Sequence, residues 1–336
     1  MNKLIQVLVA ISFVLPFLVT RSTANDIPLL QIQESQRNIF AGQNTFYHVI
    51  NTSHAPVSSL LWRLIYNNRT LAQGTTRFGN NGQDTALAEL NLPAPAIHDG
   101  VMIPANLSLF TTPDTAPVLT EKIFIFPADP FANSKQSLSD LKIALYDPDK
   151  TTQGTLEKIG LPFQPFSNIE ALPSFKGQLF IVGQNVNFDQ NPELWNSLRA
   201  LAKRRVPILI LVPQKGRFEL TNALDSSVDP AYEKLILARG NIIRAFDKNL
   251  DIDWVSGDGS ASSGVTITND DMTMHATVDP NPISWPWLEL SRKNSGTMII
   301  CGFDIVSTAE RSPAPRYFLA RLIDHLINTH SEEDLK

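Results

Sequence analysis

One stretch near the middle of the chain, residues 177–213, limits the possible folds most strongly. It reads GQLFIVGQNVNFDQNPELWNSLRALAKRRVPILILVP. The apolar runs Leu179–Val182 and Pro207–Val212 have the length and composition of buried strands. Between these runs, leucines recur at helical spacing from Leu194 to Leu201. A buried strand, an amphipathic helix and a second buried strand predict a βαβ unit whose two strands are parallel in one sheet.

Further strands and helices are expected on both sides of this unit. The expected strands are Lys142–Tyr146, Phe163–Phe166 at an edge, Asn241–Ala245 and Thr297–Cys301. The expected helices are Thr152–Ile159, Tyr232–Ala238 and Pro315–Asn328. Residues 251–279 are expected to be irregular, with room for a hairpin. The alternation of strands and helices predicts a three-layer α/β domain with a parallel, flavodoxin-like sheet over residues 141–330.

The N-terminal half, residues 26–127, has the pattern of an all-β domain. Short runs of β-forming residues alternate with turn signals about every ten residues. The expected strands are Asn44–Asn51, Leu60–Tyr66, Thr70–Gly74, Thr85–Leu90, Ala105–Phe110 and Glu121–Phe126. This spacing predicts an immunoglobulin-like β-sandwich with Trp62 in its core. Because Cys301 is the only cysteine, the sandwich has no disulfide. Residues 128–140 are expected to form a linker.

The first 24 residues have the pattern of a signal peptide. Asn2 and Lys3 precede an apolar run, Leu4–Val19, and small residues end at Ala24, where a signal peptidase would cleave. The alternative is an N-terminal membrane anchor, but the run is short for a spanning helix, which needs about 20 apolar residues. We therefore expect an exported protein, periplasmic or secreted, without a stable membrane span after cleavage.

Charge and motifs exclude several classes of function. The formal net charge is −5, which disfavours binding to nucleic acid or anionic lipid. The six histidines lack metal-ligand spacing, and no phosphate-binding or dinucleotide-binding glycine motif occurs. The aspartates at 251, 253 and 258 resemble a calcium loop only loosely, and a solvated turn is the better interpretation. We expect neither a metal nor a cofactor.

Four polar residues follow the expected strands of the C-terminal half. In an open α/β sheet, ligands bind outside the carboxyl ends of the strands. The residues at those ends are Asp147, Gln184, Gln214 and Asp304. Two carboxylates and two amides could hold a polar ligand such as a sugar. The alternative interpretation is that these residues cap helices and form turns.

Three further residue types are candidates for a functional role, and the first two have two interpretations each. Trp285 and Trp287 flank a proline in the long irregular region that also holds Trp254, so their indoles either stack on a sugar or a partner chain, or pin a loop to the body. Cys301 ends an apolar strand and is expected to be a buried core thiol, the alternative being a catalytic thiol with a nearby base. His325 is expected on the polar, solvated side of the closing helix.

Several local features of residues 141–328 carry a resemblance to a known family. Leu145-Tyr146-Asp147-Pro148 precedes a helix that ends at Gly160, Phe180-Ile181-Val182-Gly183 ends a strand, and Ile299-Ile300-Cys301 precedes the closing helix. In these features the C-terminal half resembles the class I glutamine amidotransferase-like fold. More narrowly, it resembles the version fused to sandwich domains in bacterial β-galactosidase-like and other exported carbohydrate-related proteins.

The catalytic motif of that family is missing. A working amidotransferase carries a strand that ends in a Gly-x-Cys-x-Gly turn, where the thiol meets a histidine. The comparable strand end is Leu211-Val212-Pro213-Gln214, which has neither cysteine nor serine, and proline at 213 lacks a backbone N–H. We therefore expect an exported, non-catalytic binding or assembly module linked to carbohydrate processing, with a protein partner or a carbohydrate as its ligand. The alternative is a degenerate hydrolase of glycosides or esters that uses Asp147 and Asp304.

Overall fold

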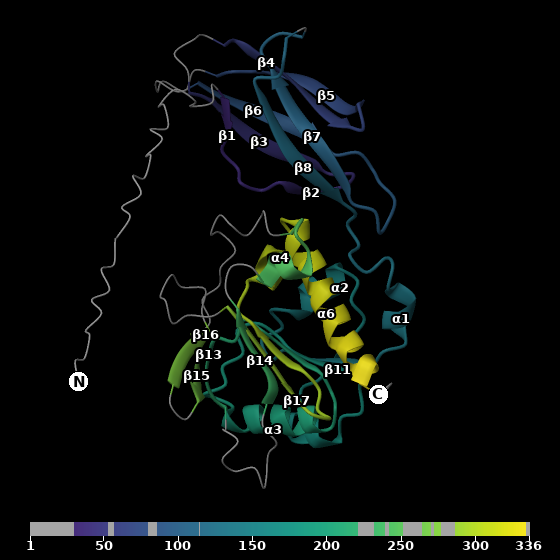
Figure 1. The fold of residues 1–336 in the computed structure, drawn as a ribbon, viewed down its shortest axis with the longest axis vertical. Helices are drawn as coiled ribbons and strands as arrows, with labels where there is room; N and C mark the ends of the chain where they lie inside the picture. The colour runs from purple at the N-terminus through teal and green to yellow at the C-terminus, as the bar shows by residue number, and fades with distance from the viewer. Residues whose placement is uncertain are drawn as a thin grey trace, which may run out of the picture.

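The computed structural model describes residues 30–52, 57–79, 86–113, 115–220, 232–238, 242–250, 264–269, 272–276 and 286–333. The predicted signal peptide, residues 1–24, lies outside these ranges. Figure 1 shows two parts stacked along the long axis, with the N-terminal strands above the C-terminal sheet. None of the helices in the described ranges combines the length and the hydropathy that crossing a bilayer requires.

The N-terminal part is all-β and consists of two sheets. One sheet has the order β1-β3-β6, and the other has the order β2-β8-β7-β4-β5. The strands are β1 (Leu30–Ile32), β2 (Asn38–Phe40), β3 (Asn44–Asn51), β4 (Ser59–Tyr66), β5 (Arg69–Arg77), β6 (Ala86–Pro93), β7 (Ile103–Phe110) and β8 (Leu119–Phe126). The six predicted strands are confirmed as elements, and β1 and β2 are additional to them.

One hydrophobic core lies between the two N-terminal sheets. Tyr47 and Val49 of β3 are fully buried from one side, while Leu64 and Leu107 of the second sheet are fully buried from the other. Trp62 of β4 belongs to the same core and is 4% exposed, as predicted. Buried and partly buried residues alternate along β4, which gives this strand one apolar face. Packing the apolar faces of the two sheets together stabilises this part of the chain.

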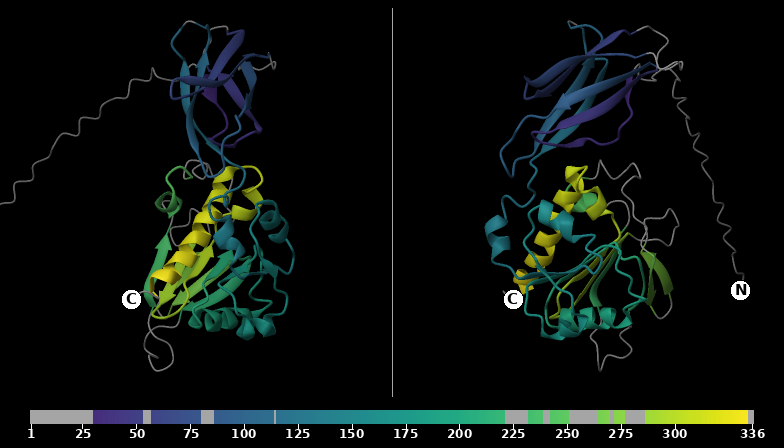
Figure 2. Two further views of the ribbon diagram at one scale, coloured as in Figure 1. Left: turned by 90° about the vertical axis from the view of Figure 1, so that its right-hand side faces the viewer. Right: turned by 180° about the vertical axis from the view of Figure 1, so that it is seen from behind.

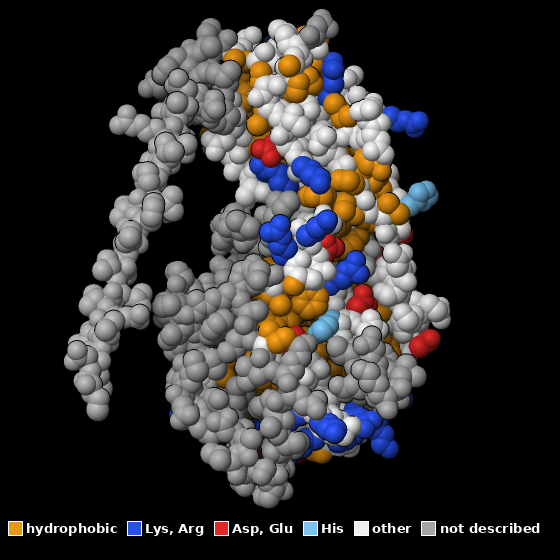
Figure 3. Space-filling view, in the orientation of Figure 1, with side chains coloured by type: hydrophobic (Ala, Val, Ile, Leu, Met, Phe, Trp, Pro, Cys, Tyr) orange, Lys and Arg blue, Asp and Glu red, His pale blue; other side chains and the backbone are white. Residues whose placement is uncertain are grey.

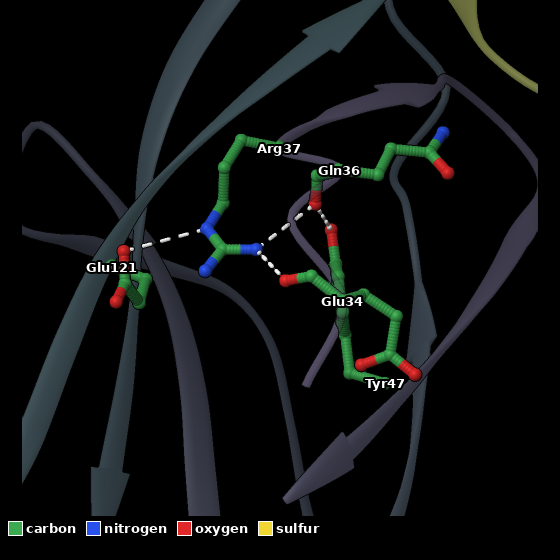
Figure 4. A network of polar contacts seen from close by, with 5 residues as sticks. All are labelled: Glu34, Gln36, Arg37, Tyr47 and Glu121. Atoms are coloured by element: carbon green, nitrogen blue, oxygen red, sulfur yellow. Dashed lines mark hydrogen bonds and ion pairs between the residues drawn. The ribbon is translucent and has the colours of Figure 1, made fainter. Parts of the chain in front are cut away.

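Side-chain contacts hold the short strands β1 and β2 in place (Figure 4). The Arg37 guanidinium donates to the carbonyl oxygens of Glu34 and Gln36 and forms an ion pair with Glu121 of β8 at 3.4 Å. The Tyr47 hydroxyl of β3 donates to the Gln36 carbonyl at 3.2 Å. The loop between β1 and β2 is therefore tied to both sheets, which compensates for strands of only three residues each.

The C-terminal part is built on a mixed sheet of seven strands with the order β10-β9-β11-β12-β18-β17-β14. The strands are β9 (Ile143–Tyr146), β10 (Gln164–Pro165), β11 (Leu179–Val182), β12 (Ile208–Leu211), β14 (Tyr232–Ala238), β17 (Trp287–Arg292) and β18 (Met298–Cys301). The strands from β10 to β18 are parallel, as the βαβ pattern predicts. β17 and β14 are antiparallel, so the expectation of a wholly parallel sheet is corrected.

Helices cover both faces of this sheet (Figures 1 and 2). They are α1 (Lys135–Ser139), α2 (Gln153–Lys158), the 3₁₀ helix η1 (Ile169–Ser174), α3 (Pro192–Lys203), α4 (Ile242–Phe246), α5 (Ile305–Thr308) and α6 (Pro313–Glu333). α2, α4, α5 and α6 share one core with Leu145 and Ile181, whereas α3 and η1 share another with Phe180 and Val182. Because successive strand residues point to opposite faces, each buried strand contributes to both cores.

Two predicted elements have the wrong type. Residues Tyr232–Ala238, expected as a helix, form β14, which pairs with β17. Residues Asn241–Ala245, expected as a strand, largely coincide with the helix α4. Both segments are short apolar runs, for which periodicity does not separate helix from strand, and long-range pairing decides the outcome. The expected hairpin exists as β15 (Gly264–Asn269) and β16 (Met272–Ala276), and β13 (Lys215–Leu220) pairs with β15.

The segment between the two parts is packed against both. Residues 128–140, expected as a linker, include α1, and Phe131 and Leu138 are buried. The Tyr317 hydroxyl of α6 donates to the Pro127 carbonyl at 3.2 Å, and burial raises the pKa of this hydroxyl. The Arg316 guanidinium lies 4.4 Å from the ring centroid of Phe40 in β2. The start of α6 therefore contacts the lower end of the N-terminal sheets directly.

Candidate functional site

Asp147, at the carboxyl end of β9, is engaged in holding the start of α2. Its Oδ2 accepts the backbone N–H groups of Thr152 and Gln153, each at 2.8 Å, and its Oδ1 lies 3.4 Å from the Thr151 hydroxyl. The first N–H groups of a helix have no partner within the helix, so a carboxylate at this place satisfies them. Asp147 thus has the geometry of a cap, which is the alternative that the sequence left open.

Gln184 and Gly183, at the end of β11, complete the same packed junction. The Gln184 backbone N–H donates to the Thr152 hydroxyl at 2.7 Å, and the Gln184 carbonyl accepts from the Thr151 hydroxyl at 3.2 Å. A Cβ on Gly183 would lie 2.7 Å from the Thr152 hydroxyl and 2.8 Å from Asp147 Oδ1. The ends of β9 and β11 are therefore closely packed around Asp147.

Asp304 and Gln214 do not join Asp147 in one crevice. Asp304 caps α5, because its Oδ1 accepts the Ser307 backbone N–H at 3.1 Å and its other carboxylate oxygen accepts the Ser307 hydroxyl. β11 and β12 lie between β9 and β18, so the ends that carry the two carboxylates are roughly 14 Å apart along the sheet. The Gln214 side chain is exposed, and its backbone N–H donates to the Val186 carbonyl at 3.0 Å.

The bend after β12 is strained but lacks a nucleophile. Val212 has φ of 35°, a left-handed conformation that is unfavourable for a β-branched residue. Its N–H donates to the Cys301 carbonyl at 2.7 Å, its carbonyl accepts from the Asn185 N–H at 3.0 Å, and its side chain is 3% exposed. Pro213 follows, and the chain then enters β13, whereas a nucleophile elbow is a strand–turn–helix.

The tryptophans differ from the predicted arrangement. Trp287, expected in an irregular region, is the first residue of β17, pairs with Cys301 in the sheet and is fully buried. It packs in the core beside Phe246 and Phe318 and offers no surface for stacking on a sugar. Trp254 and Trp285 lie outside the described residues. β17 was not predicted because Glu289 and Ser291 interrupt its apolar residues.

The environment of His325 also differs from the expected one. The imidazole is partly buried and not fully solvated: its side chain is 25% exposed, and Nε2 lies 3.1 Å from Glu289 Oε1, whose side chain is only 4% exposed. The Phe246 ring packs edge-on against the imidazole, with 5.3 Å between the ring centroids. The helical pattern of α6 alone could not show this, because β17 and α4 cover the face that carries His325.

Cys301 is a core thiol, as expected. It is fully buried in the sheet, and burial raises the pKa of the thiol to about 12. The thiolate is the reactive form of cysteine, so we predict that the native protein resists a thiol reagent such as Ellman's reagent at pH 8. The same protein in guanidinium chloride should release one equivalent of chromophore within minutes. A stoichiometric reaction of the folded protein at a similar rate would contradict the burial of this thiol.

One hollow on the α3 side of the sheet was not predicted from the sequence. This α3–β13 groove has a volume of about 320 Å³ and is lined by Phe188, Asp189, Trp195, Asn196, Arg199 and Arg217. Three of these residues recur at i, i+1 and i+4 on α3, beside the leucine stripe that faces the core. That spacing is visible in the sequence, but the contribution of Arg217 depends on the long-range pairing of β13 with β15.

Neither a metal centre nor a recognised family accounts for these residues. Within the described ranges, no three His, Cys, Asp or Glu side chains are grouped so that they could hold a metal ion. The loosely calcium-like aspartates at 251, 253 and 258 lie outside those ranges. No protein-family model matches the chain, and no curated protein matches it significantly. The geometry of the described residues is therefore the basis for a functional assignment.

Proposed function

We propose that this protein is an exported, non-catalytic binding or assembly module linked to carbohydrate processing. The observation that carries this proposal is the structural use of the two strand-end acids. Asp147 accepts two backbone N–H groups at the start of α2, and Asp304 accepts one at the start of α5. The two acids follow β9 and β18, which are separated by two other strands. Carboxylates fixed in this way are poorly placed to act together as general acid and base on one substrate.

The bend after β12 supports the same proposal. We infer that residues 141–328 form a class I amidotransferase-like, three-layer α/β domain and that residues 26–127 form an immunoglobulin-like sandwich. In such a domain the nucleophile would stand at the bend, where this chain has Val212 and Pro213. The Val212 N–H is already bonded to the Cys301 carbonyl, and proline has no N–H, so donors for an oxyanion are lacking at these two residues.

The export proposal comes from the N-terminal sequence. Residues 1–24 have the composition of a cleavable signal, and the remaining chain has a single cysteine, so its stability does not depend on an internal disulfide. A sandwich followed by a ligand-binding domain suits a protein that acts beside a partner or on a carbohydrate outside the cytoplasm. The caps on Asp147 and Asp304 weigh against the alternative of a degenerate hydrolase.

The experiment is a turnover screen of the purified protein. Aryl glycosides, aryl esters and glutamine are each incubated with the wild type and with the double variant Asp147→Asn/Asp304→Asn. We predict no release of product above the buffer rate from either protein. Turnover by the wild type that persists through an added purification step and is lost in the double variant would replace this proposal with the hydrolase alternative.

A further inference from the structure

The α3–β13 groove is rigid on one side. The Trp195 ring stacks on Phe218 with 4.3 Å between centroids, and Phe188 packs edge-on against Phe218 at 4.8 Å. All three rings are at least nine-tenths buried, and Phe188 and Trp195 line the groove, so packed aromatic rings form this wall. A preformed hollow of about 320 Å³ lies at the lower end of the size range of small-molecule sites.

The polar residues of the groove are mainly hydrogen-bond donors. Arg199 from α3 and Arg217 from β13 bring two guanidinium groups, whose planar forks match a carboxylate. Asn196 can donate and accept, and Asp189 accepts, so both suit hydroxyl groups. Asn196, Asp189 and Arg217 are exposed, which leaves their side chains within reach of a ligand. This combination fits a ligand that carries both an acidic group and several hydroxyls.

Basic residues continue from the groove along α3. Arg199 also lines a narrower cavity of about 20 Å³ together with Lys203 and Arg292. Arg205 lies just beyond the end of α3 and donates to the Asn294 side chain at 3.3 Å. Figure 3 shows Lys and Arg side chains gathered at the lower end of the molecule, the end where Figure 1 places α3. On a chain with a net charge of −5, this local positive field favours an anion as the ligand of the groove.

We propose that the α3–β13 groove binds an acidic saccharide, with a uronic-acid carboxylate on Arg199 and Arg217. The hydroxyls of the same sugar bond to Asn196 and Asp189, and further acidic sugars follow the basic residues Lys203 and Arg205. This inference rests on the proposed binding function and names its ligand class. It assigns the ligand to the α3 face of the sheet and not to the capped strand ends.

The test is isothermal titration calorimetry of the purified protein with trigalacturonate, galactotriose and sodium sulfate. We expect saturable binding of trigalacturonate that weakens as sodium chloride rises, and at least about 10-fold weaker binding of galactotriose. Arg217→Ala removes one exposed guanidinium and should weaken trigalacturonate binding about 10-fold, with Arg217→Lys in between. The matched control is Arg77→Ala at the exposed end of β5, which should change the affinity less than about 2-fold.

Each other outcome would overturn the inference in a recognisable way. Equal affinity for galactotriose, unaffected by Arg217→Ala, would leave the proposed binding function in place and move the ligand elsewhere. Competition by sulfate at the same concentrations as trigalacturonate would show a bare oxyanion site without sugar recognition. No heat with trigalacturonate at millimolar concentration would remove acidic saccharides as the ligand. Hydrolysis of a substrate in the turnover screen would contradict the proposed function, whereas the calorimetry with Arg217→Ala would still decide whether the groove binds an acidic saccharide.

Discussion

Gly296→Ala should strongly destabilise the C-terminal part, although it adds only one methyl group. A Cβ at this position would lie 2.3 Å from the carbonyl oxygen of Val206 and 2.7 Å from the nitrogen of Pro207. These are backbone atoms of the two residues just before β12, the central strand of the sheet, and they cannot move aside like the end of a flexible side chain. We expect a loss of more than about 3 kcal/mol in the free energy of unfolding, measured by urea denaturation.

The matched control is the same substitution in an open position. Gly154 lies in α2, is exposed, and has no atom within 4 Å of the Cβ that alanine would add. Because alanine favours the helix over glycine, Gly154→Ala should stabilise the protein by about 0.5–1 kcal/mol. If Gly296→Ala has the same urea midpoint as the wild type, Gly296 does not pack against the backbone of Val206 and Pro207 as closely as the structure shows.

Asp147→Ala should lower the free energy of unfolding by about 2–3 kcal/mol, because it removes a helix cap. The substitution leaves the N–H groups of Thr152 and Gln153 without the carboxylate that they contact at 2.8 Å, and the Thr152 residue is fully buried. Asp147→Asn keeps an acceptor oxygen at the same place, so its loss should stay below about 1 kcal/mol. Urea denaturation of the two variants beside the wild type gives the comparison.

The two Asp147 variants separate a cap from a functional acid. A cap needs an acceptor oxygen, whereas a general acid, a general base or a ligand for a cation needs the carboxylate itself. We therefore predict a large stability difference between alanine and asparagine at this position. If both variants are as stable as the wild type, Asp147 is not a cap, and the strand-end acids return as candidates for a functional site.

The sequence predicted the elements whose side-chain pattern is local and strong. The leucine stripe of α3 and the apolar runs of β11 and β12 define those elements without help from distant residues, and the edge position of β10 follows from Pro165. β14 and α4 were assigned the wrong type because short apolar runs suit either state. The antiparallel strands β14 and β17 depend on pairing partners far along the chain, which a single sequence does not show.

The candidate site residues also divide into those with a local sequence signal and those that depend on contacts distant in sequence. Asp147 and Asp304 were located correctly after strands, and capping was one of their two interpretations, but only hydrogen-bond geometry could decide between them. Trp287 was expected in an irregular region, either stacking on a ligand or pinning a loop, and His325 on the solvated side of its helix. In the fold, β17 buries Trp287 in the core, and α4 and Glu289 partly cover His325. The α3–β13 groove depends on β13 lying beside α3, and no local pattern predicts that contact.

The most direct test of binding without catalysis is to recover the ligand after it has bound. The purified protein is mixed with saturating trigalacturonate, binding is measured by calorimetry, and the saccharide is analysed by chromatography after one day at 25 °C. The account predicts saturable binding and a trimer that is recovered intact. Shorter saccharides formed by the wild type, and absent with Asp147→Asn/Asp304→Asn, would show that the strand-end acids are catalytic and would contradict the central claim.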